Sequence, residues 1–99
     1  MDMTHSFIPL ALDAALSALA AFAGGGGVRS DDLIAGALAL EILARDGKHS
    51  LACLIGLDAA MRGLRALATC PSLSGCERGR VAAVRFAAIV RETHKTLFH

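Results

Sequence analysis

Residues 49–69 read HSLACLIGLDAAMRGLRALAT, and this stretch decides the fold. Its apolar residues recur every three or four positions, which is the spacing of one face of an α-helix. The predicted core face of this helix comprises Leu54, Leu57, Met61, Leu64 and Ala68. Only three charged residues, Asp58, Arg62 and Arg65, form a polar strip beside it. A helix with so little polar surface must be covered on more than one side.

Small residues form a third stripe along the same helix. They are spaced alternately by four and three positions and comprise Ala52, Gly56, Ala59, Gly63 and Ala66. Each glycine inside a helix costs about 1 kcal/mol relative to alanine, so some interaction must offset this cost. Close approach of another helix backbone is the simplest such interaction. The approaching helix belongs either to the same chain or to a second copy across a dimer axis.

The helix discussed so far is predicted over residues 49–69. Three further helices are predicted, over residues 7–23, 30–46 and 77–97. Four consecutive glycines, residues 24–27, end the first helix and are expected to form a flexible hinge. We expect Ser6 to cap the first helix, with Pro9 in its first turn. Its apolar face carries Leu12, Leu16, Leu19 and Phe22, with Asp13, Ser17 and several alanines on the other side.

The second predicted helix is apolar nearly all round, so little of it is expected to face water. Ser30 is its predicted cap, and Asp31 and Asp32 suit the positive end of its dipole. Glu41 and Arg45 are four residues apart and are expected to pair on its surface. Gly47 is the expected stop.

The fourth helix follows the turn over residues 70–76, where Pro71 and Gly75 break helical structure. Its predicted apolar face comprises Ala82, Phe86, Ile89, Val90 and Leu97. Its basic side comprises Arg78, Arg80, Arg85, Arg91 and Lys95. Three apolar residues, Val81, Val84 and Ala88, interrupt that basic side and are candidate interface residues.

Composition agrees with an all-α, four-helix bundle-like single domain over residues 1–99. The chain has 55% hydrophobic residues, rich in the helix formers Ala and Leu, and it has no Trp and no Tyr. A four-helix bundle buries about one stripe per helix, so the additional apolar stripes need a cover from outside. We therefore predict a homodimer, with a further protein partner of unknown identity.

Charge is asymmetric along the chain although the formal net charge is only +1. Residues 1–46 carry six acidic and two basic side chains, whereas residues 47–99 carry eight basic and three acidic ones. We expect the acidic half to pack on the basic half, and the near-neutral total disfavours a general nucleic-acid binder. No basic residue precedes the apolar run from Phe7, and Asp13 interrupts that run, so neither a secretory signal nor a membrane span is predicted. The expected compartment is the cytoplasm.

Cysteine and histidine provide the residues with potential chemistry. Cys70 and Cys76 flank one turn, where they are either free thiols, the default in a reducing compartment, or a disulfide. A structural zinc site normally needs four ligands, and Cys53 with His5, His49, His94 and His99 does not supply an obvious second pair. No metal and no cofactor are therefore expected.

The stretch His49-Ser50-Leu51-Ala52-Cys53-Leu54-Ile55-Gly56 resembles the phosphoacceptor segment of histidine phosphotransfer domains, which are also small four-helix bundles. In that family the histidine is followed at the third and fourth positions by Lys and Gly, where this chain has Ala52 and Cys53. The resemblance implies a signalling or regulatory domain with His49 as phosphoacceptor. This is the alternative to the main hypothesis, together with a weak nucleic-acid contact through the fourth helix.

The main hypothesis is a non-catalytic, self-associating protein–protein interaction module of the adaptor, chaperone or inhibitor type. Paired carboxylates for acid–base catalysis are missing, because Asp31 and Asp32 are adjacent and so point to different sides of their helix. The glycine run follows a helix and lacks the Lys and Ser/Thr of a phosphate-binding loop. An enzyme is therefore not predicted.

Overall fold

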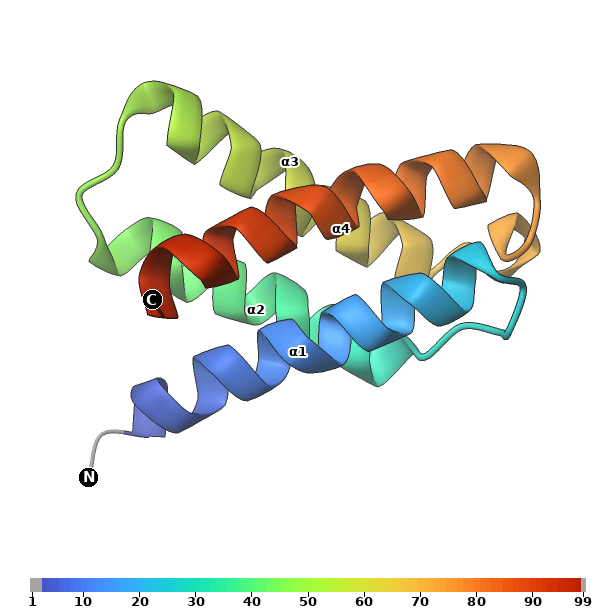
Figure 1. The fold of residues 1–99 in the computed structure, drawn as a ribbon, viewed down its shortest axis with the longest axis horizontal. Helices are drawn as coiled ribbons and strands as arrows, with labels where there is room; N and C mark the ends of the chain where they lie inside the picture. The colour runs from blue at the N-terminus through green and yellow to red at the C-terminus, as the bar shows by residue number, and fades with distance from the viewer. Residues whose placement is uncertain (1–2, 99) are drawn as a thin grey trace.

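The computed structural model describes the backbone of residues 3–98 and the side chains of residues 7–96. Its helices are α1 (Met3–Ala23), α2 (Ser30–Asp46), α3 (Leu51–Ala68) and α4 (Glu77–Phe98), with a short 3₁₀ helix, η1 (Pro71–Leu73), between α3 and α4. Successive helices run antiparallel, and α1 packs against both α2 and α4 (Figure 1). Residues 3–98 contain no strand, so the predicted all-α, four-helix bundle is confirmed.

The core lies between the four helices and is built from aliphatic side chains and one phenylalanine. Its largest fully buried side chains are Phe22, Leu12, Leu19, Leu33, Leu40, Leu64 and Val90. Ala11, Ala15 and Ala18 are also buried, although the alanines of this helix were expected to face away from the core. The reason is that α1 has a neighbour on two sides and therefore buries two stripes.

Gly36 allows α1, α2 and α3 to approach one another closely. A Cβ atom built on Gly36 would overlap the Cβ of Ala15 on α1 and would lie 3.3 Å from Cδ1 of Leu64 on α3. A larger residue in the middle of α2 would therefore push two neighbouring helices away. This contact holds the first three helices together on one side of the bundle.

The two glycine-containing loops meet at one end of the bundle. The carbonyl of Phe22 accepts hydrogen bonds from the backbone N–H of Gly75 (3.0 Å) and from Oγ of Ser74 (3.2 Å). Gly25 and Gly75 both have positive φ, and a Cβ on Gly75 would lie only 3.0 Å from Cα of Gly25. The glycine run predicted as a hinge therefore provides the docking point for the loop between α3 and α4.

Two predicted helix starts differ from the structure. The first helix begins at Met3, so the start at residue 7 and the Ser6 cap are wrong. Pro9 lies inside α1, where it costs one backbone hydrogen bond without ending the helix. The helix predicted over 49–69 begins at Leu51, after Ser50, whose Oγ accepts a hydrogen bond from the N–H of Cys53 (3.2 Å).

Ser30 begins α2 at the predicted residue but does not cap its own helix. Its hydroxyl instead donates to the carbonyl of Ala68 at the end of α3 (3.0 Å), which ties the two helices together. Leu97, which was predicted for the core face of α4, and His5 and His99 lie outside the described side chains.

Charged side chains join the acidic half of the chain to the basic half. Glu41 on α2 pairs with Arg65 on α3 (3.2 Å) and with Arg45 one turn along its own helix (3.0 Å), as the spacing predicted. His94 on α4 faces Asp13 on α1 at 3.3 Å, an ion pair when the imidazole is protonated. All these groups are partly exposed, so they orient the helices more than they stabilise them.

Candidate functional site

The two halves of α3 differ sharply in how the bundle covers them. The C-terminal half is packed into the core, where Gly63, Leu64 and Leu67 are buried. In the N-terminal half, the exposed fractions of Leu51, Leu54 and Ile55 are 74%, 36% and 61%. Leu54 was predicted to be core, and that prediction is wrong. We call Leu51, Leu54 and Ile55, with the exposed neighbours Ala52 and Ala59, the α3 apolar surface.

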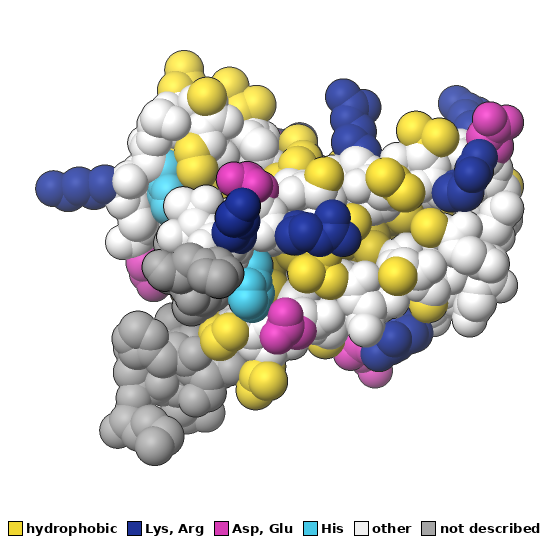
Figure 2. Space-filling model, viewed as in Figure 1, with side chains coloured by type: hydrophobic (Ala, Val, Ile, Leu, Met, Phe, Trp, Pro, Cys, Tyr) yellow, Lys and Arg dark blue, Asp and Glu magenta, His cyan; other side chains and the backbone are white. Residues whose placement is uncertain are grey.

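The N-terminal half of α3 also lies apart from α4 (Figure 1). Between the two helices runs a groove of about 440 Å³. Its lining residues are Cys53, Gly56, Leu57, Ala88, Ile89, Glu92 and Thr93. Figure 2 shows hydrophobic side chains gathered over this end of α3.

The small-residue stripe of α3 serves two different surfaces. A Cβ atom on Gly63 would overlap the ring of Phe86 on α4, so Gly63 provides an intramolecular helix contact. A Cβ on Gly56 would have no neighbouring atom within 4 Å. Ala52, Ala59 and Ala66 are exposed. Gly63 therefore belongs to the bundle, whereas Gly56 and the three alanines stay available to a partner.

Other exposed apolar side chains form smaller groups away from the α3 apolar surface. On α4, Val81 and Val84 are 59% and 60% exposed, and Ala88 is exposed one turn further on. On α2, Ile34 and Leu38 are 49% and 45% exposed, which contradicts the expectation that little of this helix faces water. The reason is that, among the described residues, α2 packs mainly against α1 and α3, and its outer face is left uncovered.

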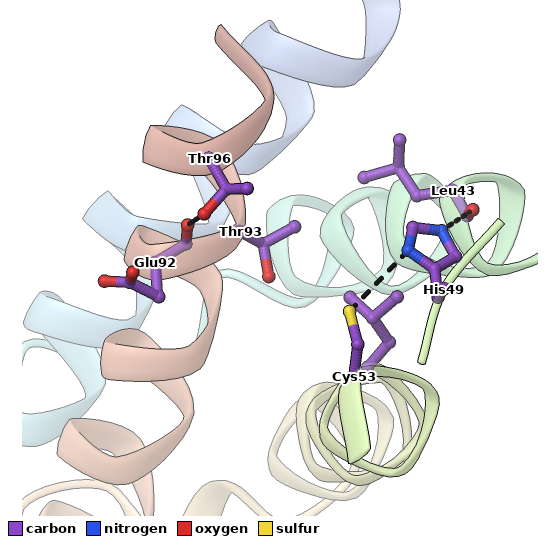
Figure 3. A pocket seen from close by; sticks show the side chains of 7 residues that line it. Leu43, His49, Cys53, Glu92, Thr93 and Thr96 are labelled. Atoms are coloured by element: carbon purple, nitrogen blue, oxygen red, sulfur yellow. Dashed lines mark hydrogen bonds between the residues drawn. The ribbon is translucent and has the colours of Figure 1, made fainter. Parts of the chain in front are cut away.

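A smaller cavity of about 140 Å³ lies where the α2–α3 loop, the start of α3 and the end of α4 meet (Figure 3). It is lined by Leu43, His49, Cys53, Leu57, Glu92, Thr93 and Thr96. Nε2 of His49 lies 2.8 Å from the carbonyl oxygen of Leu43, and Nδ1 lies 3.6 Å from Sγ of Cys53. A carbonyl only accepts hydrogen bonds, so the partner assigns the proton to Nε2.

The contacts of the two ring nitrogens of His49 bear on the hypothesis that this residue accepts a phosphoryl group. Both ring nitrogens have a partner, and the ring lies over Gly47, where a Cβ atom would overlap it. The Leu43 carbonyl also accepts from the N–H of Gly47 (3.2 Å), so His49 helps to satisfy the free carbonyls at the end of α2. This position is that of a residue that closes a loop, and the role of His49 as phosphoacceptor stays a prediction.

The remaining candidates stay separate from one another. Cys70 and Cys76 are free thiols and half-buried on either side of η1, and Sγ of Cys76 accepts the N–H of Gly79 (3.4 Å). Among the described residues, no group of three or more His, Cys, Asp or Glu side chains is arranged to hold a metal ion. Within the same residues, no helix combines the length and apolar character needed to cross a bilayer.

Comparison of the chain with protein-family models, with curated proteins and with solved structures gives no match. The function of the candidate site is therefore inferred from its geometry alone. Sequence reasoning missed Leu51 and Ile55, and a signal was available for both. Residues 51–57 are uncharged and apolar around the whole helix, whereas an internal helix of a bundle shows a polar side.

Proposed function

We propose that this chain is a non-catalytic helical interaction module that self-associates through the α3 apolar surface. The observation that carries the proposal is the exposure of Leu51, Leu54 and Ile55 within five residues of one helix. Burying a large aliphatic side chain contributes about 1.5–3 kcal/mol relative to leaving it in water. A surface with three of them gains substantially from a partner that covers it.

A second copy of the chain is a suitable partner for this surface. Two α3 helices that pair antiparallel about a two-fold axis at Ile55 place Leu51 of one copy opposite Ala59 of the other. A large side chain then faces a small one on both sides of the axis, and the two Ile55 side chains meet in the centre. Asp58 is the one charged side chain between Leu51 and Ala59, and this arrangement places it opposite Ala52 of the other copy, so the pair brings no like charges together.

The apolar residues of α4 suit a different kind of partner. Val81 and Val84 lie among Arg78, Arg80 and Arg85, which are all exposed. Two copies of that face would bring arginines together, so it favours an acidic protein over a second copy. This charge pattern supports self-association through α3 and a heterologous contact through α4.

Sedimentation or light scattering over a range of concentrations tests the proposal. We expect the wild-type chain to form a dimer, and Ile55→Glu to weaken association at least roughly tenfold by burying an unpaired charge. Val84→Glu is the matched control, because it places the same charge at an equally exposed apolar position of α4. We expect this variant to remain dimeric.

Two results would contradict the proposal. A wild-type chain that stays monomeric at all concentrations excludes self-association. Dissociation by Val84→Glu but not by Ile55→Glu moves the interface to α4. Unfolding curves of both variants provide the control for folding, since neither position is part of the core.

A further inference from the structure

We propose that Cys53 is a site of covalent modification, at which His49 acts as a base and the adjacent cavity admits a small uncharged α,β-unsaturated carbonyl compound. The proposal is independent of self-association, because Cys53 faces the cavity beside α4 (Figure 3), whereas the exposed side chains of Leu51 and Ile55 do not line that cavity. It concerns a single addition and not a catalytic cycle.

The first argument is the orientation of the imidazole. The Leu43 carbonyl accepts the proton on Nε2, which leaves Nδ1 of the neutral ring as an acceptor. That acceptor is directed at Sγ of Cys53, 3.6 Å away, within the range of hydrogen bonds to sulfur. A nucleophile, a base within reach of it and a third group that orients the base are the three parts of an activated thiol.

The second argument is access to the sulfur. Cys53 is exposed, whereas Cys70 and Cys76 are half-buried, and no described imidazole is hydrogen-bonded to either of these two thiols. Cys53 also lies in the first turn of α3, next to the positive end of the helix dipole.

The third argument is the chemistry of the cavity. Leu43 and Leu57 supply apolar surface, and the hydroxyls of Thr93 and Thr96 donate to carbonyls of their own helix. The carboxylate of Glu92 points away from His49 and Cys53 (Figure 3). The volume of about 140 Å³ is close to that of apolar protein cavities of roughly 150 Å³ that bind benzene. An uncharged compound the size of a six-membered ring fits this description better than a peroxide or an anion.

The addition balances without any further reactant. Nδ1 of His49 takes the thiol proton while Sγ forms a bond to the β-carbon of the unsaturated carbonyl. The π electron pair moves to the α-carbon and is shared with the carbonyl oxygen. The imidazolium then returns the proton to the α-carbon, which gives a thioether with no leaving group and no change in the state of His49.

The experiment uses 2-cyclohexen-1-one as the probe and follows adducts at the three cysteines by peptide mass spectrometry. We expect Cys53 to react at least roughly tenfold faster than Cys70 and Cys76, because a positioned base contributes factors of this order or more. His49→Gln keeps an amide donor for the Leu43 carbonyl but removes the base. We expect it to lower the Cys53 rate to that of the other two cysteines, with an unchanged thermal unfolding midpoint.

The solvent exposure of Cys53 alone is the competing explanation for a fast reaction of this thiol with cyclohexenone. If His49→Gln folds normally and Cys53 still reacts at the wild-type rate, base assistance is excluded and the proposal is wrong. Equal rates at all three cysteines in the wild-type chain exclude it as well.

Thr96→Phe tests the cavity separately and remains informative if His49→Gln disturbs the α2–α3 loop. Thr96 is exposed and lines the cavity from α4, so a phenyl ring there occupies the cavity without entering the core. We expect this variant to slow the cyclohexenone adduct at Cys53 severalfold and to leave alkylation by iodoacetamide, an unbranched reagent without a ring, unchanged. If both reagents react at wild-type rates, the cavity does not select the electrophile and that part of the proposal fails.

Discussion

The N-terminal and C-terminal halves of α3 differ in burial in the direction opposite to that expected from their charge. Residues 51–59 contain one charged side chain, whereas residues 60–68 contain two, yet the less charged half is the exposed one. The C-terminal half lies under Phe86 of α4 and is linked to α2 by Arg65. The N-terminal half has α2 on one side and an open groove on the other. Apolar sequence therefore shows that a surface needs cover, but not which molecule covers it.

Truncating one leucine to alanine in each half of α3 should give the largest difference in the free energy of unfolding. Leu64 is fully buried, so we expect Leu64→Ala to lower the free energy of unfolding by about 2–5 kcal/mol through lost burial and the cavity left behind. Leu51 is 74% exposed, and Leu51→Ala should change it by less than about 0.5 kcal/mol at concentrations where the chain is monomeric. Urea unfolding measures both values. Equal losses would show that the two halves are equally covered.

The two glycines of the small-residue stripe give the next largest contrast. We expect Gly63→Leu to cost about 1–3 kcal/mol or more, because a side chain there overlaps the ring of Phe86. Gly56→Leu is the matched control and should fold without this loss, since a Cβ at residue 56 meets nothing within 4 Å. Thermal unfolding of both variants measures the difference. A fully stable, folded Gly63→Leu monomer would instead place residue 63 at a contact between subunits.

Gly56→Ala tests the open space around residue 56 with a substitution that is expected to stabilise the chain. Alanine has a higher helix propensity than glycine by about 1 kcal/mol, and the open space around residue 56 accepts the methyl group. We expect the unfolding free energy of the monomer to rise by about 0.5–1 kcal/mol. A fall in monomer stability would mean that the groove closes around Gly56 in solution.

The smallest expected effect concerns the ion pairs of α3. Arg65 pairs with Glu41 across the helix interface, whereas Arg62 pairs with Asp58 within α3 (3.0 Å). Both pairs are largely exposed, so a double-mutant cycle with alanine should give a coupling below about 1 kcal/mol for Arg65–Glu41 and about 0.3–0.5 kcal/mol for Arg62–Asp58. Raising the salt concentration should reduce both. A coupling well above this range would show that the Arg65 link holds the C-terminal half in place.

The sequence predicted the number, type and approximate limits of the helices because the glycines, the prolines and the helical period are local signals. It placed Leu57 and Leu64 in the core correctly and failed for Leu54, whose spacing on the helix is just as regular. The difference is that α3 diverges from α4, and the angle between two helices depends on contacts such as Gly63–Phe86 that join distant parts of the chain. Helical period cannot report this angle.

The candidate site was predictable only in part for the same reason. Ala52, Gly56 and Ala59 were identified as a surface for close helix approach, but the stripe also included Gly63, which the bundle uses internally. His49 and Cys53 are four residues apart in the sequence, yet the helix begins between them, at Leu51 after the Ser50 cap. Their pairing depends on how the α2–α3 loop folds back onto the Leu43 carbonyl, and residue types alone do not encode that path.

The Phe22 carbonyl accepts hydrogen bonds from Gly25, Ser74 and Gly75, and the last two have a consequence for the order of folding. They join the end of α1 to residues that follow in sequence by about fifty positions. Helix pairs adjacent in the chain close short loops, whereas this link closes a long one and gains nothing until both hairpins exist. We expect this link to form after the folding transition state and to fix α4 beside α1. Ser74→Ala should then speed unfolding and leave the folding rate nearly unchanged. A slower folding rate would show that the link is already formed in the transition state.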